Sequence, residues 1–418
     1  MLSIMNTVIT VLFSVLNAYT FFYIVIGMFK TRRFSPTSKL YRYAVVIPAR
    51  NEEKVIAQLL DSIAQQSYPS HLIHVFVVAD NCSDQTAEVA QQHGATVYQR
   101  FDKSRQTKGY ALQFLFQQIE KNHGIKQFDG FFVFDADNLL KQDYIEKMNA
   151  AFASGEKIIT SFRNSKNMDT NLWSSMNSLH FLRTNRFSHR PRSYLGLSTL
   201  VQGTGFLFAR ELVAKGWNYI DLTEDRSFSV DALLQGYRVS YCDDAVFYDE
   251  QPTDFKMVIR QRNRWAKGHL QVCRKVTKPL FIHMLKQRSF ASYDVMLANI
   301  PLVLIMFLWT AFMVVMQVFQ LASLQEILHM SRSIVVSAMV TWLILALQAI
   351  YLVLVESKRI IQLSWWQKIW MIATWPLFDV LEVPTKLMAF FSDDKWRPIP
   401  HTNRNCLREI EKATSTTK

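Results

Sequence analysis

The stretch FFVFDADNLL, residues 131–140, ends an apolar run with two carboxylates, Asp135 and Asp137. Removing an unpaired charge from water is costly, so a buried strand that ends in this way needs a partner for its acids. In Asp-Ala-Asp the two acids stand at positions i and i+2, which face the same side of an extended strand. Both side chains can therefore reach one cation, or the ligands of that cation, where the strand gives way to a loop.

Mg²⁺ and Mn²⁺ are the metal ions that suit these two acids, because both favour carboxylate and water oxygens. Nucleotide phosphates supply the rest of the coordination shell in many such sites. The three-residue spacing is unspecific by itself, since it occurs often by chance. The surrounding sequence has to decide whether this is a metal site.

Strand and helix patterns alternate around this stretch, with short runs rich in Val, Ile and Phe between helical segments. The predicted strands are 43–48, 73–80, 95–99 and 130–137, and the predicted helices are 52–66, 84–93 and 107–120. This alternation is typical of βαβ units on a parallel sheet, which predicts one large α/β domain over residues 31–294. Ligands bind such sheets at the carboxyl ends of the strands.

Acids recur at these strand ends and in the second half of the domain. Asp80 ends the strand IHVFVVAD, so it lies on the same predicted edge as Asp135 and Asp137. Glu224 and Asp225 precede an apolar helical stretch, where they could simply be first-turn acids that the helix dipole stabilises. The later segment FKMVIRQRNRWAKGHLQV, residues 255–272, is basic and amphipathic. It suits a membrane-surface helix, although a neighbouring Arg and Trp also suit a diphosphate and a sugar face.

Three segments are long and uncharged: residues 5–29, 295–322 and 334–355. At about 1.5 Å per helical residue each can cross a hydrocarbon layer of about 30 Å, which predicts three membrane spans. The first segment lacks a basic start and a small-residue cleavage site, so we expect an anchor and not a cleaved signal peptide. A fourth apolar segment, residues 364–391, is interrupted by prolines and charges. It could be a span, a re-entrant pair or interfacial helices.

Charge predicts the orientation of the chain, because basic loops stay on the cytoplasmic side of a membrane. Lys30, Arg32 and Arg33 follow the first segment, so the N-terminus is expected outside and the α/β domain inside. The formal net charge of +13 is then a signal of topology and of contact with anionic lipid. No basic and aromatic recognition motif accompanies it, so nucleic acid is not an expected partner. The four scattered cysteines form no C-x-x-C motif and are expected to be free thiols.

These features divide the chain into four predicted parts. They are a transmembrane helix over 1–30, a cytosolic domain over 31–294, transmembrane and interfacial helices over 295–391, and a basic cytosolic tail over 392–418.

Together the motifs resemble the membrane-integrated family-2 glycosyltransferases, the group that contains cellulose, hyaluronan and poly-N-acetylglucosamine synthases. The matching stretches, in the expected order, are VVIPARNEE, VVADNCSD, TKGYAL, FDAD, QGTG, TED and QRNRW, between residues 45 and 265. The tail segment KWRPIPHT, residues 395–402, resembles the Trp-containing C-terminal motif of these synthases. The resemblance implies a GT-A fold, which is a Rossmann-like α/β domain that binds nucleotide sugars.

The resemblance also implies roles for matching residues. Pro48, Arg50, Glu52, Asp80, Lys108, Asp135, Asp137 and Arg264 would hold the nucleotide sugar, with Asp135 and Asp137 binding Mg²⁺ or Mn²⁺. Asp225 would be the general base, helped by Glu224. Gly203, Thr204, Gly205, Gln261 and Trp265 would contact the acceptor. Trp396, Arg397 and His401 would either gate the pocket or contact the acceptor, unless they only anchor the tail at the membrane surface.

The implied function is that of a hexosyltransferase of the bacterial plasma membrane that uses a UDP-sugar. The leading hypothesis is a processive synthase of a β-linked polysaccharide, which the QxxRW motif favours. The short membrane region favours the alternative, addition of one or a few sugars to a lipid-linked acceptor. A non-catalytic export or assembly subunit is a third hypothesis. The expected partners are the sugar donor, a polysaccharide or glycolipid acceptor, the bilayer, and either a second copy of the chain or an accessory export protein.

Overall fold

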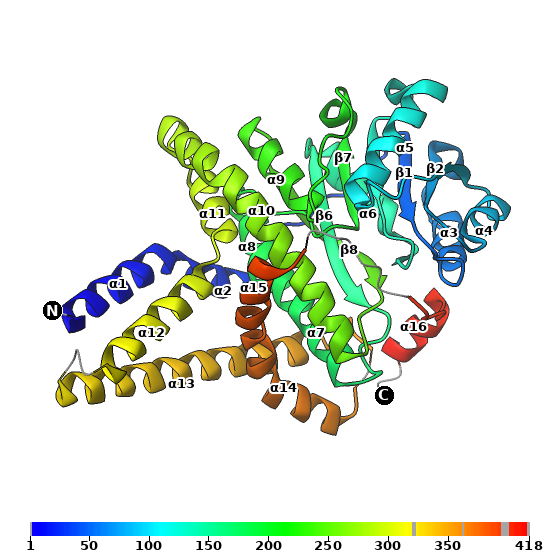
Figure 1. Ribbon diagram of the computed structural model, residues 1–418. Helices are drawn as coiled ribbons and strands as arrows, with labels where there is room; N and C mark the ends of the chain where they lie inside the picture. Colours follow the sequence, from blue (N-terminus) through cyan, green and yellow to red (C-terminus); the bar gives the residue numbers. More distant parts are fainter. Residues whose placement is uncertain (1, 320–322, 362, 394–400, 416–418) are drawn as a thin grey trace.

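The computed structural model describes residues 2–319, 323–361, 363–393 and 401–415. It contains an α/β domain and a set of apolar helices that extend from one side of it (Figure 1). The sheet has eight strands in the order β3-β2-β1-β4-β7-β6-β8-β5. Its mixed α/β architecture is that of a GT-A domain, so the predicted fold class is confirmed.

The first half of the sheet is parallel, as predicted. It consists of β1 (Tyr43–Ala49), β2 (Ile73–Asp80), β3 (Thr96–Arg100) and β4 (Gly130–Val133). The connecting helices are α3 (Ile56–Ala64), α4 (Thr86–Gln92) and α5 (Lys108–Asn122). The predicted strands and helices therefore exist, and their ends differ from the prediction by a few residues.

The second half of the sheet is mixed, and the strand and helix pattern between residues 43 and 137 did not extend to it. β6 (Ile158–Ser165) and β8 (Val239–Asp249) are parallel, but β7 (Phe206–Ala209) runs antiparallel to both β4 and β6. The two-residue β5 (Leu139–Leu140) pairs antiparallel with β8. The chain leaves β6 at the carboxyl edge and re-enters at that edge, where Phe206 pairs with Val133. Without a crossover to the other edge, β7 must run in the opposite direction.

Both faces of the sheet are covered by apolar side chains. Val45 and Ile47 of β1 pack into one cluster, whereas Ala44 and Val46 pack into the other. This alternation follows from the two-residue period of a strand, and it explains why β1 is apolar along its length. In β2 and β3 the charged side chains, Asp80 and Arg100, stand last in the strand.

The remaining helices complete the α/β domain and include the apolar helices that extend from it. They are α6 (Tyr144–Ala153), α7 (Leu172–Thr184), the π-helix η3 (Asn185–His189), α8 (Arg190–Tyr194), α9 (Glu224–Leu234), α10 (Phe255–Gln287), α11 (Phe290–Asn299), α12 (Leu302–Val318), α13 (Leu324–Val355), α14 (Trp365–Val380), α15 (Glu382–Phe391) and α16 (Leu407–Ser415). Short 3₁₀ turns lie at Ser70–Leu72, Ile125–Gln127 and Arg210–Val213.

Two helical segments of the described chain are long and apolar enough to cross a membrane. They are Ile4–Phe29, formed by α1 (Leu2–Asn17) and α2 (Tyr19–Phe29), and Ser331–Val355 of α13. The predicted third span is a pair of helices, α11 and α12, bent by 56° at Pro301. Proline has no backbone N–H and clashes with a preceding turn, so one straight helix does not form. The predicted domain boundary after residue 294 falls inside α11.

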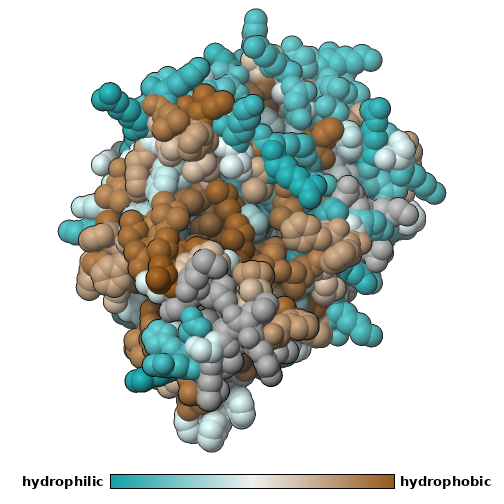
Figure 2. Space-filling view, turned by 60° about the vertical axis from the view of Figure 1, so that its left-hand side comes forward, coloured by the Kyte–Doolittle hydropathy of each residue, from teal (hydrophilic) through white to brown (hydrophobic). Residues whose placement is uncertain are grey.

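The segment 364–391 forms two shorter helices, and neither meets the criteria for a span among the described residues. α14 buries Met371, Trp375 and Phe378 and leaves Trp365 and Trp370 exposed. Exposed tryptophans of this kind gather where a protein meets the membrane surface, which favours the interfacial alternative. Figure 2 turns this side of the molecule forward and shows apolar side chains gathered in its middle, with hydrophilic ones around them.

One buried acid, Asp294 of α11, joins the N-terminal helix to the α/β domain. Its two oxygens accept hydrogen bonds from the Arg192 guanidinium at 2.7 and 2.8 Å. The hydroxyl groups of Tyr19 and Tyr23 on α2 donate to the same carboxylate at 3.0 and 2.9 Å. Asp294 is fully buried, so α2, α8 and α11 are held together by one charge and its partners.

Replacing Asp294 with alanine should destabilise the protein strongly, because the Arg192 guanidinium would stay buried without its carboxylate. Removing one partner of a buried ion pair costs about 3–5 kcal/mol. We expect thermal unfolding of the purified protein in detergent at a clearly lower temperature. The matched control is Asp169→Ala, which removes an exposed acid. Equal unfolding temperatures for the two variants would contradict this structural role.

Candidate active site at the carboxyl edge of the sheet

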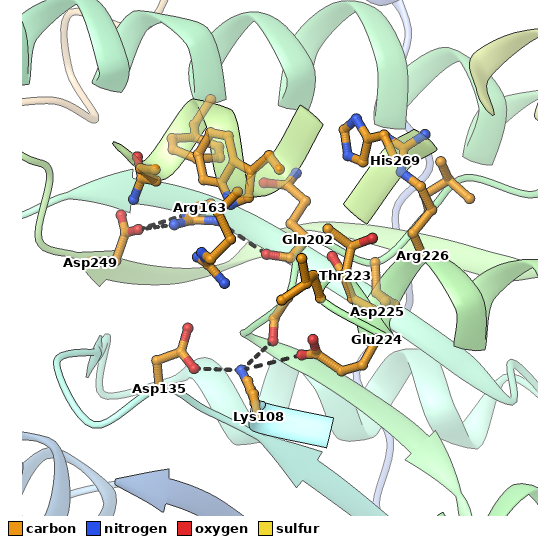
Figure 3. A pocket seen from close by; sticks show the side chains of 18 of the residues that line it. Lys108, Asp135, Arg163, Gln202, Thr223, Glu224, Asp225, Arg226, Asp249 and His269 are labelled. Atoms are coloured by element: carbon orange, nitrogen blue, oxygen red, sulfur yellow. Dashed lines mark hydrogen bonds and ion pairs between the residues drawn. The ribbon is translucent and has the colours of Figure 1, made fainter. Parts of the chain in front are cut away.

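A cavity of about 530 Å³ follows the carboxyl edge of the sheet and continues toward the membrane side of the domain. Its walls come from the ends of β1, β2, β4, β6 and β8, from α7 and α9, and from α10, α11 and α15. Figure 3 shows that the charged side chains of these elements point toward one another across the cavity. The expectation that ligands bind at the carboxyl ends of the strands therefore identified the edge of the sheet where the cavity lies.

The carboxyl ends of β1 and β2 and the loop after β1 form one end of the cavity, where Pro48, Arg50, Glu52 and Asp80 all line the wall. Asp80 is buried and accepts a hydrogen bond from the Arg100 guanidinium at 2.5 Å. Burial raises the pKa of Asp80, and the charge of Arg100 only partly opposes this. The Arg50 guanidinium donates to the Gln106 amide oxygen at 3.3 Å.

Asp135 and Asp137 lie at the end of β4 and both line the cavity. The Asp135 side chain is 39% exposed, whereas Asp137 is buried. The Glu250 backbone N–H donates to Asp137 Oδ2 at 2.9 Å. Burial acts to raise the pKa of Asp137, but the charges of His401 and Lys166 outweigh it, so the pKa lies below its ordinary range. Asp137 is thus held as an anion.

These two carboxylates fit a divalent cation by their chemistry. The described residues contain no group of three or more His, Cys, Asp and Glu side chains that could hold a metal ion. Asp135 and Asp137 offer carboxylate oxygens to the same cavity, which is enough when phosphate and water oxygens complete the shell. An ion here would therefore depend on a bound phosphate ligand.

Lys108, at the start of α5, connects the two sides of the cavity. Its ammonium group forms an ion pair with Asp135 and donates to the Gly203 carbonyl oxygen at 2.7 Å. It also lies 4.0 Å from Glu224 Oε1. Burial acts to lower the pKa of Lys108, but the charges of Asp135 and Glu224 overcome this and raise it. Lys108 therefore stays charged between the two groups of acids.

Glu224 and Asp225 stand in the first turn of α9, with both side chains on the cavity wall. Burial raises the pKa of Glu224 to about 8, and the neighbouring charge of Asp225 adds to this effect while Lys108 opposes it. Burial also raises the pKa of Asp225, against the charges of Arg226, Lys108 and Arg264. The two carboxyls interact at close range, so they titrate as a pair in which both pKa values lie above the ordinary range.

The QGTG motif shapes this wall in two different ways. Gly203 lines the cavity, as expected for an acceptor pocket. Thr204 and Gly205 lie behind the wall, so the structure does not place them where they could contact an acceptor. Thr204 is 1% exposed and its hydroxyl accepts from the Asp135 backbone N–H at 2.8 Å. Gly205 has a φ of 65° and packs against Phe247, where a side chain would collide with the ring.

The QxxRW motif lies on α10, on the side of the cavity opposite the strand ends. Gln261, Arg264 and Trp265 all line it. The Trp265 ring meets Phe181 edge to face, with centroids 6.0 Å apart. The charge of Arg264 acts on Asp225, which places the guanidinium on the acidic side of the cavity. The Gln261 side-chain oxygen is buried without a hydrogen-bond partner among the described residues.

One ion pair in the wall was missed by sequence reasoning. Arg163 of β6 donates from Nε to Asp249 Oδ2 at 2.7 Å, and its guanidinium lies 3.7 Å from the centre of the Phe181 ring. Burial raises the pKa of Asp249 to about 6, although Arg163 opposes it. Asp249 ends a strand in VFYDEQ, so the rule that identified Asp80 could have identified it too.

The described part of the tail lies against the cavity. His401 Nδ1 is 2.9 Å from Glu52 Oε1, and the backbone N–H groups of Thr402 and Asn403 donate to Glu250 at 2.9–3.1 Å. Burial acts to lower the pKa of His401, but the charge of Asp137 and the bond to Glu52 raise it to about 10. Trp396 and Arg397, for which we predicted a related role, lie outside the described residues.

Glu224 should titrate far above an ordinary glutamic acid. Because burial raises its pKa to about 8, the carboxyl is protonated at pH 6 and loses its proton only as the pH rises through that value. Infrared difference spectra recorded during a pH titration should show this carboxyl band disappear near pH 8. The band should be missing in Glu224→Gln. A titration of the same band in the ordinary range of Glu, near pH 4, would show the raised pKa to be wrong.

Comparison with known proteins identifies relatives of this chain. The chain is 26% identical to "Probable glycosyltransferase YdaM" of Bacillus subtilis, over 58% of this chain and 59% of that protein. It is 24% identical to the "Beta-monoglucosyldiacylglycerol synthase" of Synechocystis, over 54% of this chain and 47% of that protein. It thus spans about half the length of the curated relatives it matches.

Among solved structures, the mannosyltransferase PcManGT from Pyrobaculum calidifontis, in complex with GDP-Man and Mn²⁺, has the same fold. Its TM-score is 0.56 at 16% identity, and the match covers 93% of this chain and 99% of that one. The model of the glycosyltransferase like family 2 matches residues 41–268, which include every motif from the first strand to QRNRW. The chain belongs to this glycosyltransferase family.

Proposed function

We propose that this protein transfers a sugar, with inversion, from a UDP-sugar to an acceptor held at the membrane surface. The observation that carries this proposal is the arrangement of one cavity. Acids suited to a metal–diphosphate lie at the strand ends, a buried acid pair lies on α9, and Lys108 lies between them. Members of the same family are named as glycosyltransferases, and a protein of the same fold was solved with a nucleotide sugar.

The donor would lie along the strand ends. Asp80, Arg50 and the loop from Pro48 to Glu52 line the end of the cavity that would hold the base and ribose. Lys108 and Arg264 would face the diphosphate, where positive charge stabilises the departing UDP in the transition state. Asp135 and Asp137 would hold Mg²⁺ or Mn²⁺, which supplies further positive charge to the diphosphate when it is bound.

The acceptor would approach from the side of α9 and α10. Asp225 would take the proton from the acceptor hydroxyl as that oxygen attacks the anomeric carbon, and a positioned base of this kind contributes about 10²–10⁴-fold. Glu224, protonated at neutral pH, would orient Asp225 or the acceptor. Attack opposite to the leaving diphosphate inverts the anomeric centre, so an α-linked donor gives a β-linked product.

The membrane end of the cavity favours a lipid-linked acceptor that receives one or a few sugars. Val295 and Ala298 of α11 and Thr385 of α15 line this end. α11 leads directly into the apolar helix α12, and α15 packs against α12. α12 extends away from the α/β domain (Figure 1). An acceptor with an apolar tail could therefore stay in the bilayer while its head group reaches Asp225. A relative of this chain is named as a glycolipid synthase.

Processive polysaccharide synthesis is the second candidate. It is favoured by Trp265 of the QxxRW motif, which lies on the cavity wall beside Phe181, where a sugar ring can stack on an aromatic face. The two candidates share the chemistry of each transfer and differ in the length of the product.

Product analysis separates the candidates. The purified protein in detergent would be incubated with Mg²⁺ or Mn²⁺, each common UDP-sugar and a lipid extract, with UDP release and product size followed together. UDP release with short, lipid-extractable products would support glycolipid synthesis. A high-molecular-weight product sensitive to glycosidases would support the polysaccharide synthase. No UDP release with any donor, with and without lipid, would count against transferase activity in this chain.

Asp225→Asn should nearly abolish transfer while leaving UDP binding close to that of the unaltered protein. The side chain keeps its size but can no longer accept a proton, so we expect turnover to fall about 10²-fold or more. UDP binding would be measured by calorimetry and turnover by UDP release. Asp231→Asn, a change on the same helix outside the cavity lining, serves as the control. Normal turnover in Asp225→Asn would reject the base assignment.

Trp265→Ala should impair use of the acceptor more than hydrolysis of the donor. Loss of the ring removes the stacking face but leaves the strand-end acids and Lys108 in place. We expect KM for the acceptor to rise by about tenfold, as for loss of one aromatic contact of about 1–1.5 kcal/mol. Phe181→Leu tests whether the neighbouring ring positions the tryptophan. An equal loss of donor hydrolysis and transfer would contradict the stacking role.

A further inference from the structure

A second cavity, of about 420 Å³, lies on the far side of β8 from the sheet's first half, at the ends of two candidate membrane helices. Thr31 and Arg33, which follow α2, and Val355, the last residue of α13, line it. The candidate spans end at Phe29 and Val355, so the cavity opens where both helices leave the apolar layer on the same side.

Basic side chains outnumber acids in this cavity. Its basic lining residues are Arg33, Lys141, Arg186, Arg190 and Arg359. Its acidic lining residues are Asp243, Asp244 and Glu356. Three of the arginines are occupied by ion pairs with Asp243 and Glu356, at 2.7–3.6 Å. Arg33 and Lys141 form no ion pair within the described part of the chain, so the cavity keeps excess positive charge.

Two buried polar atoms of this lining also lack a hydrogen-bond partner in the described structure: Arg186 Nε and Thr31 Oγ1. Arg186 is 7% exposed, and its other nitrogens donate to Glu356, to the Met28 carbonyl oxygen and to the Tyr351 hydroxyl. A buried donor without an acceptor costs about 1–3 kcal/mol. An anionic oxygen in the cavity would satisfy Arg186 and neutralise the excess charge.

We propose that this cavity binds the phosphate group of an anionic phospholipid from the bilayer. Phosphate oxygens suit guanidinium and ammonium donors, and basic pockets between membrane helices on the cytoplasmic side are typical headgroup sites. The position at the ends of α2 and α13 favours a lipid over free phosphate, because the acyl chains can remain beside the helices. This inference does not depend on the proposed sugar transfer.

The same short helical segment lines both cavities. Arg186 and Arg190 of η3 and α8 face the second cavity, whereas Ser188, His189 and Arg192 face the first. A lipid bound to Arg186 would therefore stabilise a segment that also lines the first cavity. α2 packs directly on this segment at Gly27, where any side chain would collide with the Arg186 carbonyl group.

The test compares lipid binding by the full chain and by a double variant, Arg33→Gln with Lys141→Gln. The delipidated protein in detergent would be titrated with short-chain phosphatidylglycerol, phosphatidylcholine or inorganic phosphate, and its unfolding temperature followed. Lys121→Gln with Lys126→Gln, two exposed basic residues outside the cavity lining, is the matched control. Native mass spectrometry would count the retained lipids.

We expect phosphatidylglycerol to raise the unfolding temperature, with phosphatidylcholine and phosphate having little effect. The double variant should need about 30-fold more phosphatidylglycerol, from about 1 kcal/mol for each basic residue lost. An equal response of all three proteins, or no response, would overturn the site. A response to inorganic phosphate as large as that to lipid, lost in the double variant, would overturn the lipid as the natural occupant.

Discussion

Buried carboxylates cannot be gathered at one edge of a sheet unless positive charge is gathered with them, and most of the candidate site follows from this constraint. Lys108 meets Asp135 and lies within 4.0 Å of Glu224, Arg100 meets Asp80, and Arg163 meets Asp249. Each pairing compensates for the cost of taking an acid out of water. Glu224 reaches Lys108 only at 4.0 Å, and burial lets it hold its proton to about pH 8.

This distribution of charge gives the cavity two chemically different sides. Asp137 is held ionised at the strand ends, which suits a cation and a diphosphate. On α9, burial raises the pKa of both acids and holds a proton on Glu224 at neutral pH, which suits a base beside a neutral group. Two carboxylate sites with different proton affinities are what a transferase needs when it binds a charged leaving group and deprotonates a hydroxyl in the same cavity.

Buried ion pairs also join the apolar helices to the α/β domain. Asp294 ties α2 to α8 and α11, and Glu356 ties the end of α13 to Arg186 and Arg190. These pairs lie where apolar helices meet the α/β domain, and a polar contact there has few competing waters. The segment 185–192 carries arginines to both contacts, and it also lines both cavities. Arg186 and Arg190, four residues apart, face the second cavity, whereas Ser188 and Arg192, also four apart, face the first.

The sequence by itself determined the features that depend on neighbouring residues. Short runs rich in Val, Ile and Phe marked β1, β2 and β4, strand-end acids marked the ligand edge at Asp80, Asp135 and Asp137, and long uncharged runs marked the apolar helices. The tertiary structure alone decided features that join distant residues. The antiparallel direction of β7 depends on where the chain re-enters the sheet. Thr204 lies behind the cavity wall because its hydroxyl accepts a hydrogen bond from the Asp135 backbone N–H. Arg163 forms its ion pair with Asp249 only in the folded chain. Folding also brings Arg33 into the lining of the second cavity, beside Arg186. A local sequence pattern indicates which face of a strand or helix a residue occupies. The residue that it contacts across that face depends on how the helices and strands pack together.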